Sequence, residues 1–133
     1  DKALLFAAGV FSAALAEFGS ANGFLGHIGG DDFLIISTPD LAPRLCEAIT
    51  TRFDKGITAL YPPADRDKGF IAVLNRRGQA EQFPLMTISI ADVTNERRRY
   101  DNFLELGEAA AELKAKAKAY HQSIWLIDRP VSG

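Results

Sequence analysis

The sequence predicts an α+β fold in which helices cover one face of a mostly antiparallel sheet. In three segments, apolar residues recur at spacings of three and four, which is typical of helices with one buried side. Short apolar runs flank glycine-containing turns elsewhere, which is typical of β-hairpins. The resulting order is helix, hairpin, helix, small hairpin, strand, helix, strand. An order of this kind favours a helix-covered sheet over an all-helical or all-strand architecture.

Composition limits the class of protein. The chain has 133 residues, of which 47% are hydrophobic and 24% charged, so we expect one folded domain spanning residues 1–133. The net charge of −2 argues against a nucleic-acid partner and against direct membrane contact by this domain. The single cysteine, Cys46, excludes an internal disulfide and favours a cytoplasmic location. The longest uncharged run, residues 3–16, is too short to span a bilayer.

The first half of the chain contains the clearest structural signals. A helix is expected from Asp1 to Phe18, with a buried side formed by Leu4, Ala7, Ala8, Phe11, Leu15 and Phe18. The runs 24–28 and 33–37 flank Gly29-Gly30-Asp31-Asp32, which is the strongest hairpin signal in the sequence. Asp40 is the expected N-cap of a second helix, with Pro43 in its first turn. Its expected inner face is Leu45, Ala48, Ile49 and Phe53.

The second half is predicted from weaker patterns. We expect a loop over residues 61–69, a small hairpin formed by 70–74 and 79–83, and a strand over 85–93. Asp101 is the expected cap of a third helix, and a closing strand is expected over 123–127. The apolar face expected for this helix is Phe103, Leu106, Ala110, Leu113 and Ala117.

The turn at residues 29–32 has two possible interpretations. Adjacent carboxylates repel each other, and one of them could bind a hard cation such as Mg²⁺ that is shared with phosphates. Glycines beside them would let phosphates approach the backbone closely. An ordinary solvated turn explains the same four residues, because turns favour Gly and Asp. These four residues alone leave both interpretations open.

A wider set of residues resembles the GGDEF domain family of bacterial cyclic-di-GMP signalling. The most specific part is Gly29-Gly30-Asp31-Asp32-Phe33 between apolar strands. Residues 87–91, Thr-Ile-Ser-Ile-Ala, are similar to the family's later Thr-x-Ser-Ile-Gly strand. The segment 113–118 is similar to the family's Ala-Leu-Tyr-x-Ala-Lys helix, and Asp1 matches the Asp of its Gly-Asp-x-x-Leu segment. The matches follow the family's order over nearly the whole chain.

The resemblance implies a ferredoxin-like fold related to nucleotide cyclase and polymerase palm domains. It implies a homodimer that condenses two GTP molecules to cyclic di-GMP with Mg²⁺ or Mn²⁺, downstream of a sensory or receiver domain. By that match Asp31 and Asp32 would be the catalytic carboxylates, and Asp31 would bind the metal. Gly29 and Gly30 would line the phosphate approach. Lys118 would neutralise phosphate charge, and Asp1 would contact the guanine edge.

Departures from the family pattern leave alternatives open. The chain begins after the family's opening strand and helix, which carry the other metal-binding Asp, so we expect an inactive fragment of a longer protein. Asp32 stands where the family has Glu, and the other departures are His27, Ala91 and Gln122. A degenerate GTP-binding or dimerisation domain and a ferredoxin-like protein-interaction module are therefore the alternatives.

By the same resemblance, we expect residues 61–84 to be a hairpin that is inserted relative to plainer members of that family. Its cations are Arg66, Lys68, Arg76 and Arg77. They could contact a partner or an anion, or they could be solvated turn charges, which contribute little energy.

Overall fold

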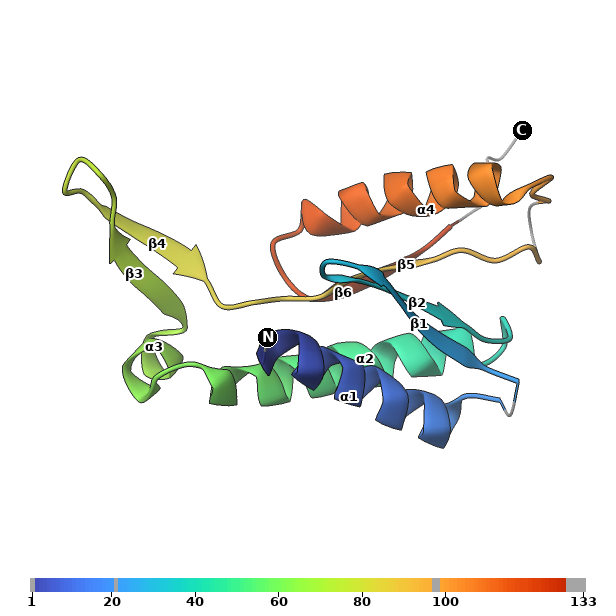
Figure 1. The fold of residues 1–133 in the computed structure, drawn as a ribbon, viewed down its shortest axis with the longest axis horizontal. Helices are drawn as coiled ribbons and strands as arrows, with labels where there is room; N and C mark the ends of the chain where they lie inside the picture. The colour runs from blue at the N-terminus through green and yellow to red at the C-terminus, as the bar shows by residue number, and fades with distance from the viewer. Residues whose placement is uncertain (1, 21, 97–98, 129–133) are drawn as a thin grey trace.

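The structure is a computed structural model that describes residues 2–20, 22–96 and 99–128. It is layered, with two helices on one side, short strands in the middle and one helix on the other side (Figure 1). The helical layer consists of α1 (Lys2–Phe18) and α2 (Ala42–Ile57). The middle layer contains β1 (Phe24–Gly29), β2 (Asp32–Ile36), β5 (Ser89–Asp92) and β6 (Ile124–Ile127). The opposite layer is α4 (Phe103–Lys118), which packs on β5 and β6.

The expected α+β class is confirmed, but the helices lie on both sides of the strands and not on one face as expected, and the strands are divided among small sheets (Figure 1). In the part of the chain that is described, β1 pairs with β2 and β3 (Phe70–Leu74) pairs with β4 (Ala80–Pro84), both antiparallel. The third pair, β5 with β6, is parallel, so the described strand pairs are mostly antiparallel as we expected, but they belong to three small sheets and not to one. Each strand therefore retains one edge that no other described strand pairs with.

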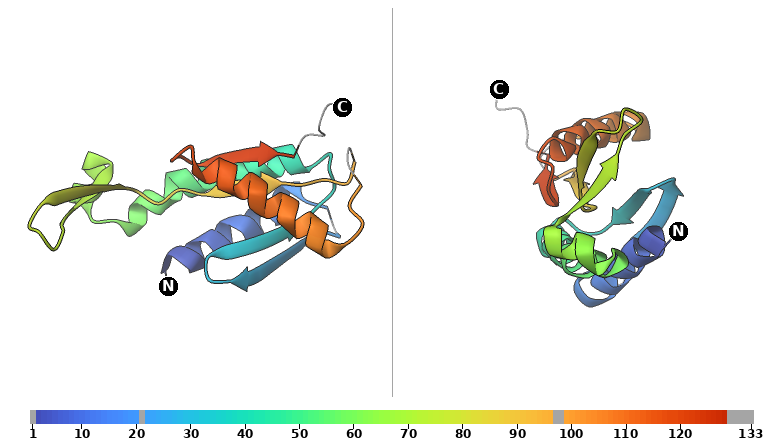
Figure 2. Two further views of the ribbon diagram at one scale, coloured as in Figure 1. Left: turned by 90° about the horizontal axis from the view of Figure 1, so that it is seen from above. Right: turned by 90° about the vertical axis from the view of Figure 1, so that its left-hand side faces the viewer.

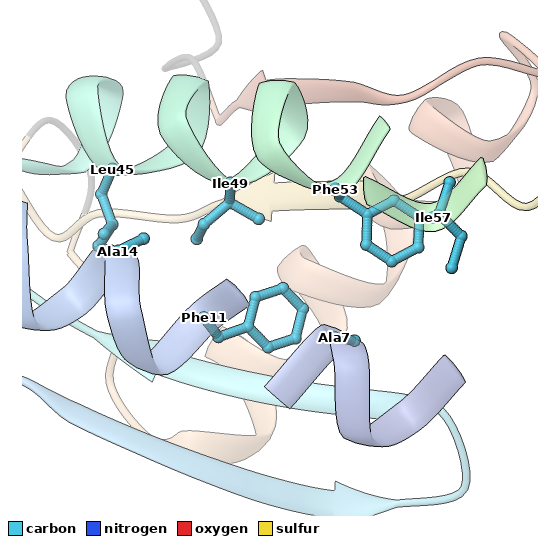
Figure 3. Packing of buried hydrophobic residues seen from close by; sticks show 7 residues of the cluster. All are labelled: Ala7, Phe11, Ala14, Leu45, Ile49, Phe53 and Ile57. Atoms are coloured by element: carbon cyan, nitrogen blue, oxygen red, sulfur yellow. The ribbon is translucent and has the colours of Figure 1, made fainter. Parts of the chain in front are cut away.

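The core lies between α1 and α2 (Figure 3) and extends to the strands. Seven buried residues form the cluster: Ala7, Phe11, Ala14, Leu45, Ile49, Phe53 and Ile57. The predicted inner-face residues Leu45, Ile49 and Phe53 are 2–3% exposed, so this prediction is confirmed. Partly buried residues of β1, β2 and the β5 region cover the cluster: Leu25, Phe33, Ile35, Ile88 and Ile90. The hairpin and the β5–β6 pair thus share one core.

Residues 58–84 project from this layered body (Figures 1 and 2). The predicted hairpin is present as β3 and β4, but the loop expected over 61–69 is wrong. A 3₁₀ turn, η1 (Thr58–Leu60), continues from α2 and is followed by a short helix, α3 (Pro63–Lys68). Proline at the start of α3 presets the helical backbone, and Gly69 ends the helix with a φ of 80°. Arg66 holds α3 in place by donating to the Thr58 and Tyr61 carbonyl oxygens.

Two predicted helix caps are also wrong. Leu41 and not Asp40 is the N-cap of α2, without a side-chain cap, because the backbone N–H groups of Leu41 and Ala42 already bond to the Thr38 carbonyl oxygen. Asn102 and not Asp101 caps α4, and its side-chain oxygen accepts from the Glu105 N–H at 2.8 Å.

The fifth and sixth strands are shorter than predicted. The strand expected over 85–93 is regular only at Ser89–Asp92, and the closing strand begins at Ile124, one residue later than expected. Within the span 85–93, only Ser89–Asp92 pairs with another described strand, β6. No helix among the described residues is both long and apolar enough to cross a membrane.

Candidate functional site

The turn between β1 and β2 is the candidate site, and its backbone requires glycine. Gly30 and Asp31 form the tip, and Gly29 pairs with Asp32 after a register shift that follows His27. Gly29 has a φ of 151° and Gly30 a φ of 55°, which are conformations that residues with a Cβ rarely adopt. A Cβ added at either glycine would meet no atom within 4 Å. The backbone at the tip therefore adopts a conformation that suits glycine, and it is open to an approaching ligand.

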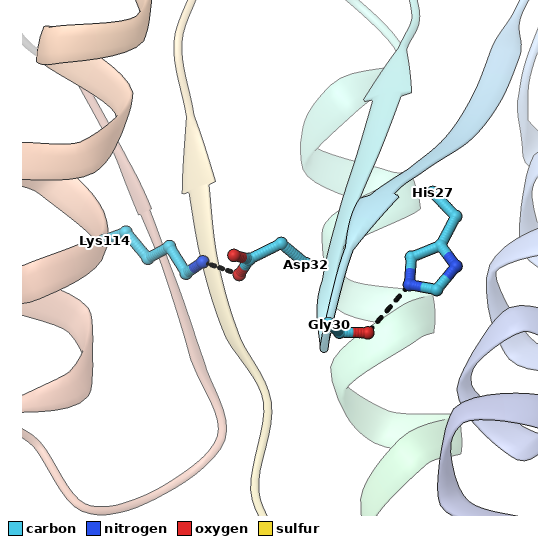
Figure 4. Close-up of polar contacts among 4 residues, drawn as sticks. All are labelled: His27, Gly30, Asp32 and Lys114. Carbon is cyan, nitrogen blue, oxygen red and sulfur yellow. Dashed lines mark hydrogen bonds and ion pairs between the residues drawn. The ribbon is translucent and has the colours of Figure 1, made fainter. Parts of the chain in front are cut away.

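Aromatic contacts fix the turn on the core. The His27 ring stacks on Phe33 with centroids 4.5 Å apart, and Phe33 meets Phe11 of α1 edge-on at 4.9 Å. His27 Nε2 donates to the Gly30 carbonyl oxygen at 2.8 Å (Figure 4). Because a carbonyl oxygen can only accept, Nε2 must carry a proton. Phe33, the last residue of the five-residue motif, thus anchors the hairpin on α1, and the hydrogen bond from His27 to Gly30 fixes the conformation of the tip.

The two motif carboxylates have different environments. Asp32 begins β2 and pairs with Lys114 of α4 through a hydrogen-bonded ion pair (Figure 4). The hydrogen bond and charge of Lys114 lower the pKa of Asp32, and Lys118 and His27 act in the same direction. The Asp32 side chain is 46% exposed and that of Lys114 is 34% exposed. Water therefore screens the pair, and its main effect is to orient Asp32 toward α4.

Asp31, in contrast, is exposed at the tip, and no hydrogen bond or ion pair of its side chain is present among the described residues. Lys118 lies one turn after Lys114 and is exposed at the end of α4. The structure thus brings together five of the predicted site residues: Gly29, Gly30, Asp31, Asp32 and Lys118. The sixth, Asp1, lies outside the described residues.

The fit of a divalent metal to this turn is incomplete. Mg²⁺ in nucleotide sites is held by one or two carboxylates together with substrate phosphates. Asp31 offers one carboxylate to which no described residue bonds, whereas Asp32 already bonds to an ammonium group. Within residues 2–20, 22–96 and 99–128, no group of three or more His, Cys, Asp or Glu side chains is arranged to hold a metal ion. Asp31 therefore suits one position in a shared metal site and does not form a complete one.

A polar cavity of about 320 Å³ lies away from the turn, between α2 and the start of β6. Its carboxylates have partners within the molecule. Glu47 accepts from the Trp125 indole N–H at 3.0 Å, and Asp54 accepts from the Ser123 hydroxyl. Ser123 also accepts from the Ile88 N–H at 3.0 Å. These bonds attach α2 to the β5–β6 pair, so we assign the cavity a structural role.

Comparisons of the chain with protein-family models, with curated proteins and with solved structures found no match.

Sequence reasoning missed the part that Lys114 and His27 play. Lys114 and Asp32 are 82 positions apart, so no local pattern predicts their contact. One signal was present, because Lys114 and Lys118 are four residues apart and so lie on one helix face. That face could have been predicted to meet the acidic turn. From the sequence alone, His27 is identifiable only as a departure from the family pattern.

Proposed function

We propose that this chain is a GGDEF-type domain of bacterial cyclic-di-GMP signalling. In the intact parent protein, two such domains would form a dimer in the cytoplasm and condense two GTP molecules to cyclic di-GMP. The observation that carries the proposal is the open Gly29–Gly30 turn, which presents Asp31 to solvent while Asp32 is held by Lys114. A hairpin turn requires the positive-φ glycines in any case, so the features that a plain solvated turn does not need are the ammonium group beside Asp32 and the open approach to the tip.

The arrangement supports a triphosphate as the ligand. Phosphates can approach a backbone that lacks Cβ atoms at Gly29 and Gly30. Lys114 and Lys118 place positive charge on the α4 face that meets the turn, and Lys118 is exposed. Positive charge fixed near a phosphoryl group stabilises the charge that develops during transfer. A divalent ion, when bound, would add further charge neutralisation.

The finer fold that we propose is ferredoxin-like. The β1–β2 hairpin and the β5 region cover the same core cluster, yet β2 and β5 each have an edge that no described strand pairs with. A strand placed between β2 and β5 would satisfy both edges and join the two pairs into one sheet. In the family, the strand that precedes Asp1 would take this position.

The test uses the natural protein that contains this chain, incubated with GTP and Mg²⁺. Formation of cyclic di-GMP is followed by chromatography for the wild type, for Asp31→Ala and for a control, Asp40→Ala. Asp40 is a second exposed aspartate in a turn. We expect the control to keep its rate and Asp31→Ala to lose about 100-fold or more, as for other groups that stabilise transition-state charge. Equal product from both variants would remove Asp31 from the mechanism.

A second candidate, a non-catalytic GTP-binding or regulatory domain, is favoured by the Asp32–Lys114 ion pair. This contact engages the second motif carboxylate within the protein and reduces its availability to a metal. Calorimetric titration with GTP distinguishes the candidates. Saturable heat without product supports the regulatory domain, and saturable heat with product supports the enzyme. The absence of binding heat supports the ferredoxin-like interaction module.

A further inference from the structure

The projecting β3–β4 hairpin, residues 70–84, has exposed apolar side chains and two outer strand edges with which no described strand pairs. We refer to it as the arm. Leu74 is 75% exposed, and Val73 and Phe83 are each more than 40% exposed. The arm stands clear of the layered body (Figures 1 and 2). An isolated two-stranded hairpin is marginally stable in water, and a stable one normally gains a third strand or a packing surface. The arm therefore lacks the third strand or packing surface that normally stabilises a hairpin.

The register of the arm shows which backbone groups are free. The Asn75 N–H donates to the Gln79 carbonyl oxygen at 2.9 Å, so these two residues form a hydrogen-bonded pair. Hydrogen-bonded and non-hydrogen-bonded pairs alternate along an antiparallel ladder. Given the pairing of Leu74 with Ala80, the residues that point their N–H and C=O groups away from β4 are Phe70, Ala72 and Leu74. The outer edge of β3 thus presents three unpaired donor–acceptor sets.

The two outer edges of the arm are not equivalent. β3 reads Phe-Ile-Ala-Val-Leu, with no charge and no proline, and its pairing with β4 contains no bulge. β4 carries Glu81, and Pro84 occupies one of its outward-facing positions, where it has no N–H to donate. Charge and proline are the devices that normally protect a strand edge from pairing with another chain. Only the β3 edge lacks both.

We propose that β3 pairs antiparallel with β3 of a second copy of this chain, about a two-fold axis at Ala72. The outward-facing residues would then exchange hydrogen bonds across the axis, with Phe70 of each copy opposite Leu74 of the other. Every cross-strand pair in this register is apolar, so no charge is buried or opposed. The product is a four-stranded antiparallel sheet made from two arms.

The charges at the two ends of β3 fit the same arrangement. Arg76 and Arg77 are exposed at the tip, and neither guanidinium has a partner among the described residues. Asp67 is exposed in α3 at the base of the arm. Antiparallel pairing brings the tip of each arm to the base of the other, so the arginines approach Asp67 of the second copy. Lys68 opposes this attraction, while Arg66 is engaged by the Thr58 and Tyr61 carbonyl oxygens.

The size of the contact predicts a weak dimer. One five-residue strand edge with its adjacent side chains buries less than the roughly 800 Å² per partner of a standard stable interface. We therefore expect a concentration-dependent equilibrium between about 10 µM and about 1 mM.

Sedimentation equilibrium of the chain over this concentration range tests the proposal. Ala72→Pro removes an outward N–H from β3 and leaves the β3–β4 ladder intact. Since both copies lose a donor, we expect about 30-fold weaker association. Ala72→Lys places like charges opposite each other across the two-fold axis and should also weaken association. The matched controls are Gln82→Pro and Gln82→Lys, at the cross-strand partner of Ala72 on the other edge, and they should leave association unchanged.

A charge exchange tests the register. Arg77→Glu and Asp67→Lys should each weaken self-association. An equimolar mixture of the two variants should associate again, because in the mixed dimer the charge at the tip of each arm is opposite to the charge at the base of the other arm. The proposal is overturned if the wild type remains monomeric at about 1 mM, if it forms irregular aggregates, or if Ala72 and Gln82 substitutions act alike. Failure of GTP binding would leave this result unchanged, because the arm contains none of the turn residues.

Discussion

Cys46 provides the sharpest test of the packing of α2. The side chain is 7% exposed, and burial raises the pKa of its thiol from 9.0 to about 12, with smaller contributions from Asp92 and Glu47. The native protein thus holds the neutral thiol at a pH where the unfolded chain ionises it. Each pKa unit corresponds to about 1.36 kcal/mol, so the three units correspond to about 4 kcal/mol of free energy of unfolding.

The sign of the effect follows from proton binding. Below pH 9 both states keep the proton, and Cys46 imposes no pH dependence. Between pH 9 and 12 only the unfolded state loses it, so the stability of the wild type falls as the pH rises. At pH 10.5, halfway through this window, the loss is about 2 kcal/mol. Cys46→Ala removes the ionisable group and costs about 1 kcal/mol of packing at pH 7.

The expected outcome is a reversal in the order of stability. Urea unfolding, followed by circular dichroism under reducing conditions, should show Cys46→Ala less stable than the wild type at pH 7 and more stable at pH 10.5. Tyrosines and lysines also titrate at high pH, but they are common to both proteins and cancel in the difference. A difference that stays constant between the two pH values would show that the Cys46 thiol is not desolvated.

Further predictions concern groups near the core and the turn. Burial raises the pKa of Asp92, so its carboxylate destabilises the native state at neutral pH, and Asp92→Asn should raise the urea midpoint at pH 7 and do so less at pH 4. Lys114→Ala should return the lowered pKa of Asp32 toward 3.8, measured by NMR titration of the carboxyl carbon. Gly30→Ala should lower the free energy of unfolding by about 1 kcal/mol through its positive φ alone, since nothing obstructs the added methyl group. Phe53→Ala should lower it by about 3–5 kcal/mol.

Local signals made much of the fold predictable. The hairpin around Gly29 and Gly30 follows from residues that must lie next to each other, because only glycine adopts the required φ without strain. The inner face of α2 follows from apolar spacing, since three of the four residues expected there are buried. These features depend on neighbours within one turn or one hairpin, where sequence patterns are most reliable.

Competing contacts explain the failures. Phe103 was expected on the buried face of α4, yet it is 90% exposed, because the helix begins there and only its later turns cover the strands. A helix, α3, forms within the span 61–69 where a loop was expected, because Arg66 donates hydrogen bonds to the Thr58 and Tyr61 carbonyl oxygens. The prolines in this segment do not predict those bonds. Asp40 does not cap α2, because the Thr38 carbonyl oxygen already accepts from backbone N–H groups at the start of the helix.

In the candidate site too, features that depend on neighbouring residues could be predicted, and features that depend on distant residues could not. The position of Asp31 on an exposed tip is local and was predicted, whereas the engagement of Asp32 by Lys114 depends on how α4 packs. Two adjacent carboxylates on a turn repel each other, and a lysine beside one of them relieves that repulsion and leaves the other free. The two positions therefore have separate effects. Loss of Lys114 removes the positive charge that neutralises and orients Asp32, and loss of Asp31 removes the carboxylate that faces solvent. If both substitutions reduced GTP binding equally and without additivity, the two carboxylates would act as one unit, and the division of roles argued from Lys114 would be wrong.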